Sequence, residues 1–152
     1  MDYNRQNYKM HGENDKSQLQ LPAFNPNWIN KGIDAECVKF CEALAKKLSD
    51  VDDEGNSGRN KVSSSFLRNI FGEIRRIQAK GFEVSKPDFY MLRPKVAYAA
   101  ARAKTRKDSG DPTPFREIYN KMADQVKTAS DFNNMVSMIE AIVAYHKVYN
   151  PK

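Results

Sequence analysis

Two arginines, Arg68 and Arg75, lie seven residues apart in the segment SSSFLRNIFGEIRRIQAKG, residues 63–81. At about 100° per residue, a helix brings both side chains to one face, opposite a stripe of Phe, Leu and Ile. Gly72 and Ala79 share the arginine face and remove bulk from it, although glycine costs a helix about 1 kcal/mol relative to alanine. Because guanidinium groups bind phosphate through paired hydrogen bonds, this spacing predicts a surface that a chain of phosphates approaches closely.

A second basic stripe follows in KVAYAAARAKTR, residues 95–106. Lys95, Arg102 and Arg106 recur there at helical spacing beside Tyr98. The tyrosine offers stacking or a hydroxyl contact, and the basic side chains offer phosphate contacts. Valine and alanine make a thin apolar face on the other side of this segment, which suits close packing against another helix. This stripe is therefore a second candidate surface for nucleic acid.

Positive charge is concentrated in this part of the chain. Residues 63–107 contain eleven basic and three acidic residues, a net charge of +8, whereas the whole chain carries +6. The remainder is therefore slightly acidic, at −2. One basic helix is usually a solvated face, but two neighbouring basic helices favour a functional groove for an anionic partner. The first phosphate contacts expected are Arg68, Arg75, Lys95 and Arg102, with Arg76, Arg93, Tyr98 and Arg106 as further candidates. Arg93 precedes Pro94, and bracing the bundle is an alternative role for it.

Helical periods and caps predict the elements that carry these side chains. A chain of 152 residues with 40% hydrophobic content is long enough for one domain with a sizeable core. We expect a single all-α bundle of about five helices, with a flexible N-terminal arm over 1–27, a helical domain over 28–152 and a long loop at 50–62. Phe24, Trp28 and Ile29 are expected to pack the lead-in onto the core. The first expected helix is 34–48, and the second starts at one of Ser63, Ser64 or Ser65 and stops near Gly81. The others are 94–107 opened by Pro94, 113–127, and one capped by Ser130 or Asp131 that runs nearly to the end.

Features typical of enzymes are missing from the sequence. It has no glycine-rich phosphate loop, and its two histidines, His11 and His146, have no nucleophile beside them. Cys37 and Cys41 are spaced by one helical turn, which suits free thiols better than a disulfide or a metal site. The acidic run DVDDE reads as a solvated loop. We therefore predict no catalytic residues, no metal and no cofactor, and, without an apolar run of membrane length, a cytoplasmic protein with no membrane contact.

The segments VSSSFLRNIFGEIRRIQ (62–78) and YMLRPKVAYAAARAK (90–104) resemble the small subunit of the type III-A CRISPR effector, the Csm complex. Ala101 departs from the glycine that many members have. The resemblance implies a non-catalytic helical protein of antiviral defence that stacks as the inner filament of a ribonucleoprotein. It also implies contacts with the backbones of guide RNA and target RNA, with other Csm subunits and with copies of itself. The domain over 28–152 would then serve RNA binding and assembly.

Other interpretations remain beside this one. A free-standing helical nucleic-acid-binding protein of another family would show sequence preference, yet neither basic helix is rich in the Asn or Gln that read bases. An RNA-processing enzyme would need a base or metal site that the sequence does not display. The long loop at 50–62 would permit helix exchange, so a dimer of the isolated chain stays open.

Overall fold

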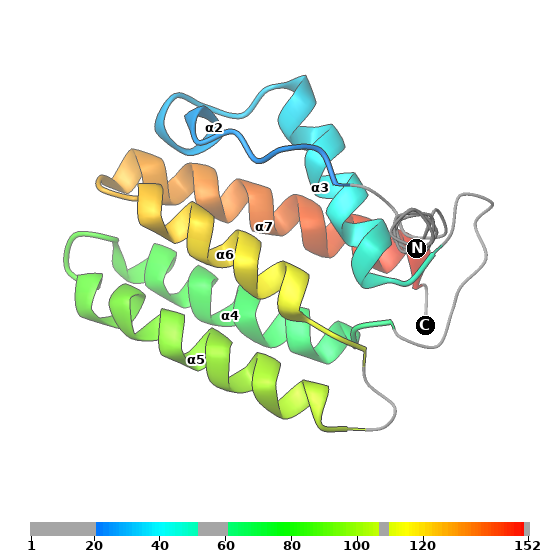
Figure 1. Cartoon of the computed structure of the whole chain (residues 1–152). Coiled ribbons are helices and arrows are strands. Elements are labelled where there is room, and N and C mark those ends of the chain that lie inside the picture. The colour runs from blue at the N-terminus through cyan, green and yellow to red at the C-terminus, as the bar shows by residue number, and fades with distance from the viewer. Residues whose placement is uncertain (1–20, 52–60, 107–109, 151–152) are drawn as a thin grey trace, which may run out of the picture.

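The computed structural model describes residues 21–51, 61–106 and 110–150, and within these residues it contains helices and no β-strand. Figure 1 shows them as α2 (Asn27–Asn30), α3 (Ala35–Leu48), α4 (Ser64–Lys80), α5 (Lys86–Lys104), α6 (Thr113–Gln125) and α7 (Ala129–Tyr149). The predicted all-α bundle is confirmed, with the single-turn helix α2 added to five longer helices. Most of the predicted arm and of the loop after α3 falls on residues 1–20 and 52–60, which lie outside the described ranges.

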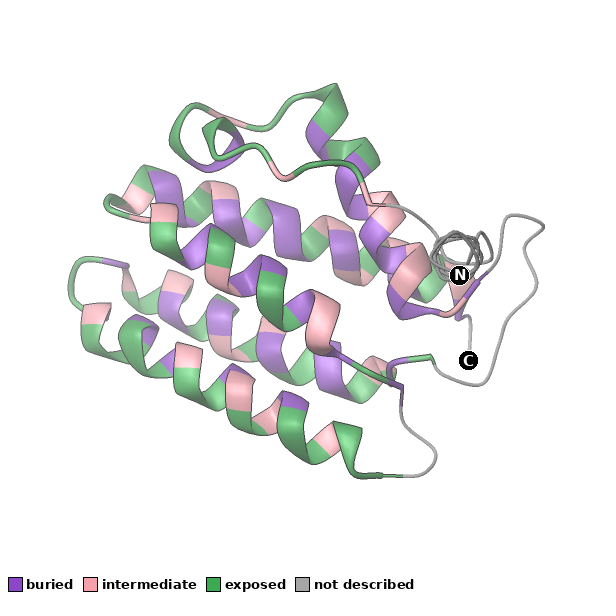
Figure 2. Cartoon of the chain, viewed as in Figure 1, coloured by how far each residue is buried: buried purple, intermediate pink, exposed green. Residues whose placement is uncertain are grey.

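Helix α7 is the central element of the bundle. It packs against α2, α3, α4 and α6, and Met135, Ile139 and Ile142 on it are fully buried. Helix α5 lies at the edge, where its main neighbours are α4 and α6. Figure 2 shows the result, with buried positions along α7 and a largely exposed outer side on α5. The two basic segments, α4 and α5, therefore lie side by side at one margin of the protein (Figure 1).

The predicted ends of α3 and α4 are confirmed by their caps. The Asp34 carboxylate accepts a hydrogen bond from the Cys37 backbone N–H at 2.8 Å. Ser63 Oγ accepts one from the Phe66 N–H at 3.1 Å, so both residues satisfy amides that the first turn leaves unpaired. Gly81 ends α4 with φ 102°, a conformation that residues with a side chain rarely adopt.

The prediction that Pro94 opens the next helix is wrong, because α5 begins eight residues earlier, at Lys86. Pro87 occupies the first turn, and Pro94 lies inside the helix. Pro94 lacks the N–H that would bond to the Tyr90 carbonyl. Both residues are exposed, so water can bond to that carbonyl and the helix continues. The predicted end near 107 was also late, since α5 ends at Lys104.

The last helix also begins before its predicted cap. Its N-cap is Thr128, whose hydroxyl accepts from the Asp131 N–H at 3.1 Å. The Asp131 carboxylate in turn accepts from the Thr128 N–H at 3.2 Å, which completes a reciprocal capping box. Asp131 is therefore a first-turn residue, and the sequence interpretation confused the two partners of one box. The preceding helix correspondingly ends at Gln125, two residues short of the prediction.

Two clusters of aromatic rings connect different elements of the bundle. Phe132 on α7 stacks on Phe82, with ring centroids 5.1 Å apart, and meets Phe89 of α5 edge-on at 5.5 Å. In a second cluster the ring centroid of Trp28 lies 5.3 Å from that of Phe40 on α3. The Phe24 ring contacts both, at centroid separations of 5.9 Å from Trp28 and 6.1 Å from Phe40. The lead-in before α3 therefore packs onto the core, as its aromatic residues predicted.

The two cysteines are free and buried, as their spacing predicted. The Cys41 thiol donates to the Met138 carbonyl at 3.5 Å. A hydrogen bond with Cys37 and burial both raise the pKa of the Cys41 thiol, so it stays neutral. These residues act as small core side chains on the α3 face that meets α7.

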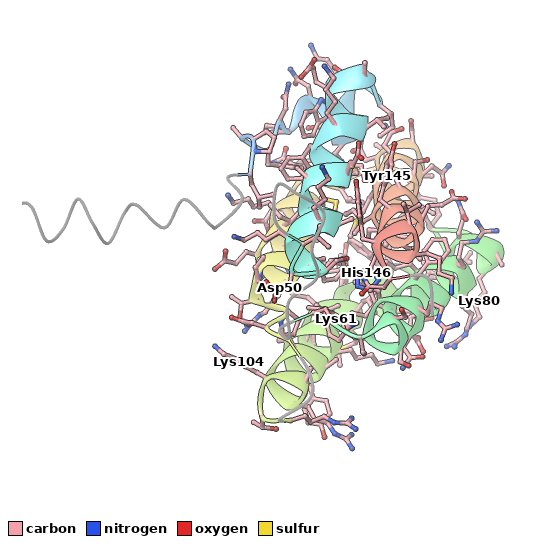
Figure 3. All side chains as sticks on the ribbon, turned by 90° about the vertical axis from the view of Figure 1, so that its right-hand side faces the viewer. Asp50, Lys61, Lys80, Lys104, Tyr145 and His146 are labelled. Atoms are coloured by element: carbon pink, nitrogen blue, oxygen red, sulfur yellow. The ribbon has the colours of Figure 1, made fainter. Side chains whose placement is uncertain are left out.

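His146 is buried where α3 ends, α4 begins and α7 ends (Figure 3). Its Nε2–H donates to the Val62 carbonyl at 2.9 Å, directly before α4. Asn150, the last described residue, donates to Ser49 Oγ at 2.6 Å and connects the end of α7 to the end of α3. Burial lowers the pKa of His146; the Val62 hydrogen bond acts against this, and the charge of Lys61 adds to it.

The burial of His146 predicts a loss of stability in mild acid. The unfolded chain binds a proton at this histidine below about pH 6.5, whereas the folded chain binds it only at a lower pH. The free energy of unfolding therefore falls between these two pH values, by up to about 1.4 kcal/mol per pH unit. In His146→Gln an amide can still donate to Val62 without titrating. Urea unfolding at about pH 7.5 and 5.5 is expected to show a larger loss in the wild type than in the variant. Equal losses would contradict a neutral, buried His146.

Candidate nucleic-acid interface

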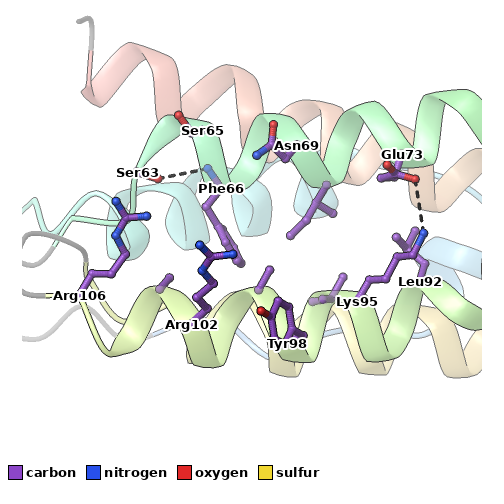
Figure 4. A pocket seen from close by; sticks show the side chains of 14 residues that line it. Ser63, Ser65, Phe66, Asn69, Glu73, Leu92, Lys95, Tyr98, Arg102 and Arg106 are labelled. Carbon is purple, nitrogen blue, oxygen red and sulfur yellow. Dashed lines mark hydrogen bonds and ion pairs between the residues drawn. The ribbon is translucent and has the colours of Figure 1, made fainter.

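A groove of about 550 Å³ runs between α4 and α5. Its floor is apolar, because Phe66, Ile70 and Val96 turn buried side chains toward it. Helix α5 forms one wall and α4 the other, as Figure 4 shows. The remaining lining residues are Ser63, Ser65, Asn69, Glu73, Leu92, Lys95, Tyr98, Ala99, Arg102, Ala103 and Arg106.

The α5 wall carries the positive charge of the groove. Lys95, Tyr98, Arg102 and Arg106 follow one another at intervals of three or four residues and line the same wall (Figure 4). Arg106 lies just beyond the helix end. The Tyr98 ring is 67% exposed, so a face or its hydroxyl is available to a ligand. Cations above an apolar floor, with an accessible aromatic ring, form a surface suited to a nucleic-acid strand.

The α4 wall is low, because its exposed side chains are short, and it is mostly neutral. Ser65 and Asn69 line it and are exposed, and Gly72 is exposed beside them. Counting about 100° per residue, Gly72 lies between Asn69 and the stripe formed by Arg68 and Arg75. A strand in the groove would therefore meet little bulk on its way across α4 to these two arginines.

One acidic side chain, Glu73, lines the groove within the described residues. Its carboxylate accepts two hydrogen bonds from Arg76, at 3.0 and 3.1 Å. Lys95 Nζ reaches across from α5 to within 4.0 Å of the same carboxylate (Figure 4). Arg102 and Arg106 make no ion pair with any described residue. Arg102 and Arg106 are therefore available to a ligand.

The model of the Csm2 Type III-A family matches residues 36–152 of the chain. The chain belongs to the Csm2 Type III-A family. It is thus a small subunit of the type III-A CRISPR effector, the Csm complex, and the predicted resemblance is confirmed. Comparisons with curated proteins and with solved structures gave no match.

The Csm2 family is one of structural subunits, and the described chain contains no group of three or more His, Cys, Asp or Glu placed to hold a metal ion. The same ranges contain no helix long and apolar enough to cross a membrane. The Nε2 atom of the buried His146 is hydrogen-bonded to the Val62 carbonyl. The acidic run DVDDE falls on residues 50–54, of which 52–54 lie outside the described ranges.

The residues predicted as contacts in this Csm2 protein fall into two groups on one margin. Lys95, Tyr98, Arg102 and Arg106 line the groove together. Arg68 and Arg75 are exposed on α4 but do not line it, and the Arg75 guanidinium lies 5.7 Å from the centre of the Phe71 ring. The groove thus unites Lys95, Tyr98, Arg102 and Arg106 and leaves Arg68 and Arg75 beyond its α4 wall.

The two other predicted RNA contacts of the Csm2 chain, Arg76 and Arg93, already form ion pairs within the protein. Arg76 is paired with Glu73. Arg93 donates to the Asp124 carboxylate at 2.7 Å and so links α5 to α6, the bracing role that its position before Pro94 left open. A phosphate at either guanidinium would compete with a carboxylate that is already bound there.

Three polar residues of the α4 wall were not among the predicted contacts: Ser65, Asn69 and Glu73. Their positions on the helical wheel fall between the arginine stripe and the apolar stripe. Without the place of α5, the sequence does not say which flank of α4 faces a neighbouring helix. Their shared polarity on one flank is the signal that could have selected them.

Gly72 is not required by packing inside this Csm2 chain, since a Cβ built there meets no atom within 4 Å. We expect Gly72→Ala to raise the free energy of unfolding by about 0.5–1 kcal/mol, because alanine favours the helix. RNA affinity is expected to fall at the same time if the glycine serves a close approach. Thermal unfolding and RNA titration of one preparation measure both effects. A more stable variant with unchanged affinity would remove the ligand-based reason for this glycine.

Proposed function

We propose that this Csm2 protein is a non-catalytic structural subunit that holds the backbones of the target RNA and guide RNA in the type III-A complex. The observation that carries the proposal is the groove between α4 and α5, whose basic wall unites Lys95, Tyr98, Arg102 and Arg106. Family membership supports a place in the complex, and the groove supports a nucleic-acid strand as the ligand.

The chemistry of the groove favours contacts that do not read sequence. Arginine and lysine bind phosphate oxygens, which are the same for every nucleotide. Tyr98 offers a ring face, on which any base can stack. A subunit of an effector that accepts many targets needs this kind of contact. Arg68 and Arg75 extend the same surface across the low α4 wall.

Assembly with other copies and subunits requires further surfaces. We propose that copies stack as an inner filament, so that the grooves of successive copies follow one RNA. Tyr90 and Met91, 63% and 57% exposed, are large apolar side chains in the first half of α5. Val148 near the end of α7 is 66% exposed. Such exposed aromatic, methionine and aliphatic side chains suit subunit contacts, including those of a dimer of the isolated chain.

The proposal is tested by RNA binding of the wild-type chain. Labelled single-stranded RNAs of several unrelated sequences would be titrated at about 50 and 200 mM salt. We expect similar affinities for all sequences and a steep loss of affinity at the higher salt, because bound cations replace counterions on the phosphates. Strong preference for one sequence would favour a free-standing sequence reader instead. Absence of binding to every RNA would contradict the proposed function.

A further inference from the structure

Glu73 divides the groove into two unlike ends. It lines the wall of α4, and its side chain is 35% exposed. At this end it contacts Arg76 and Lys95, while Arg102 and Arg106 at the other end have no ion pair within the described residues. Positive charge of the groove is therefore partly neutralised at one end and fully available at the other.

A second ion pair adds to the neutral end. Lys80 on α4 lies 3.8 Å from the Asp88 carboxylate on α5, and both residues line a small cavity together with Glu73, Arg76 and Lys95. Three cations and two carboxylates meet there. A phosphate entering this cavity would approach two negative groups and compete with them for the same donors.

The geometry of the Arg76 pair makes this competition direct. The two terminal nitrogens of Arg76 donate to the two oxygens of Glu73, and arginine binds phosphate through the same forked arrangement. Carboxylate and phosphate therefore compete for this edge of the Arg76 guanidinium. Lys95 is drawn toward Glu73 from the opposite wall, so that one carboxylate holds a cation from each helix.

We propose that Glu73 is an internal competitor of the RNA phosphates: it holds Arg76 and Lys95 and confines the grip on RNA to the Arg102–Arg106 end of the groove. This inference rests on the proposed function of the groove. It makes Glu73 a determinant of how many phosphates one subunit engages. A short footprint and modest affinity per copy suit a subunit that acts in a row of copies along one strand.

The experiment compares the wild type with Glu73→Gln, which keeps the shape of the side chain and removes its charge. The probe is a labelled oligouridylate, titrated over a series of salt concentrations. We expect binding about three- to tenfold tighter at low salt, and a plot of log affinity against log salt that is steeper by about one to two units, since one or two cations become available to phosphate. A double variant with Lys95→Ala is expected to lose part of that gain.

Glu83→Gln is the matched control, because it makes the same change in net charge. Glu83 pairs with Lys86 at 3.1 Å and does not line the groove. Its salt slope is expected to match the wild type. An equal gain in both variants would overturn the inference, since net charge would then explain it, and so would weaker binding by Glu73→Gln. If the wild type binds RNA and Glu73→Gln binds it equally, the inference alone fails; if neither binds, the proposed function fails with it.

Discussion

Replacing Arg102 and Arg106 together by alanine is expected to weaken RNA binding about 30-fold. Each guanidinium is expected to make a charge-assisted contact worth about 1 kcal/mol, so two contacts give a factor of this size. The slope of log affinity against log salt should fall by about two, one unit per lost phosphate contact. Titration with single-stranded RNA at several salt concentrations measures both quantities.

A control with the same loss of charge comes from α6. Arg116 and Lys121 are exposed there and do not line the groove, so Arg116→Ala with Lys121→Ala also removes two positive charges. We expect this variant to stay within about threefold of the wild type, because distant exposed charges are largely screened. Similar losses in the two double variants would show that net charge, and not the groove, attracts the RNA.

Truncating Phe132 to alanine is expected to lower the free energy of unfolding by about 3–5 kcal/mol, the usual cost of removing a buried phenylalanine. Phe132 is fully buried and contacts Phe82 and Phe89, so it connects the start of α7 to the start of α5. Since domains of this kind are stable by about 5–15 kcal/mol, this loss is a large fraction of the total. Urea denaturation followed by circular dichroism measures it.

Tyr90→Ala is the matched control for this stability prediction. Tyr90 belongs to the same helix as Phe89, but its side chain is 63% exposed. Its truncation is expected to change the free energy of unfolding by less than about 0.5–1 kcal/mol. Equal losses in Phe132→Ala and Tyr90→Ala would mean that the aromatic cluster does not hold the start of α5.

The sequence predicted the elements whose limits depend on neighbouring residues. Asp34 and Ser63 cap their helices through contacts three residues along the chain, and Gly81 ends α4 by its own conformation. The rule for proline failed at Pro94 because exposure, a property of the folded chain, decides whether an unpaired carbonyl is tolerated. The prediction of the α7 cap failed because Thr and Asp are both common capping residues, and a capping box contains one of each at its two positions.

The sequence predicted several residues of the candidate site but not how the two helices that carry them face each other. Spacing within α5 was enough to place Lys95, Tyr98 and Arg102 along one wall. Which flank of α4 faces that wall depends on how the two helices pack, and this is fixed by contacts distant in sequence. The pairing of Glu73 with Lys95 across the groove was therefore beyond a reading of either helix alone.

The most direct test of the central claim is to locate the RNA on the chain. Single-stranded RNA carrying 4-thiouridine would be cross-linked to the wild-type protein by light, and the modified peptides identified by mass spectrometry. We predict adducts on the two walls of the groove, within residues 65–76 and 95–106, with Tyr98 among them. Adducts confined to α3, α6 or α7 would contradict the assignment of the RNA surface to the groove between α4 and α5.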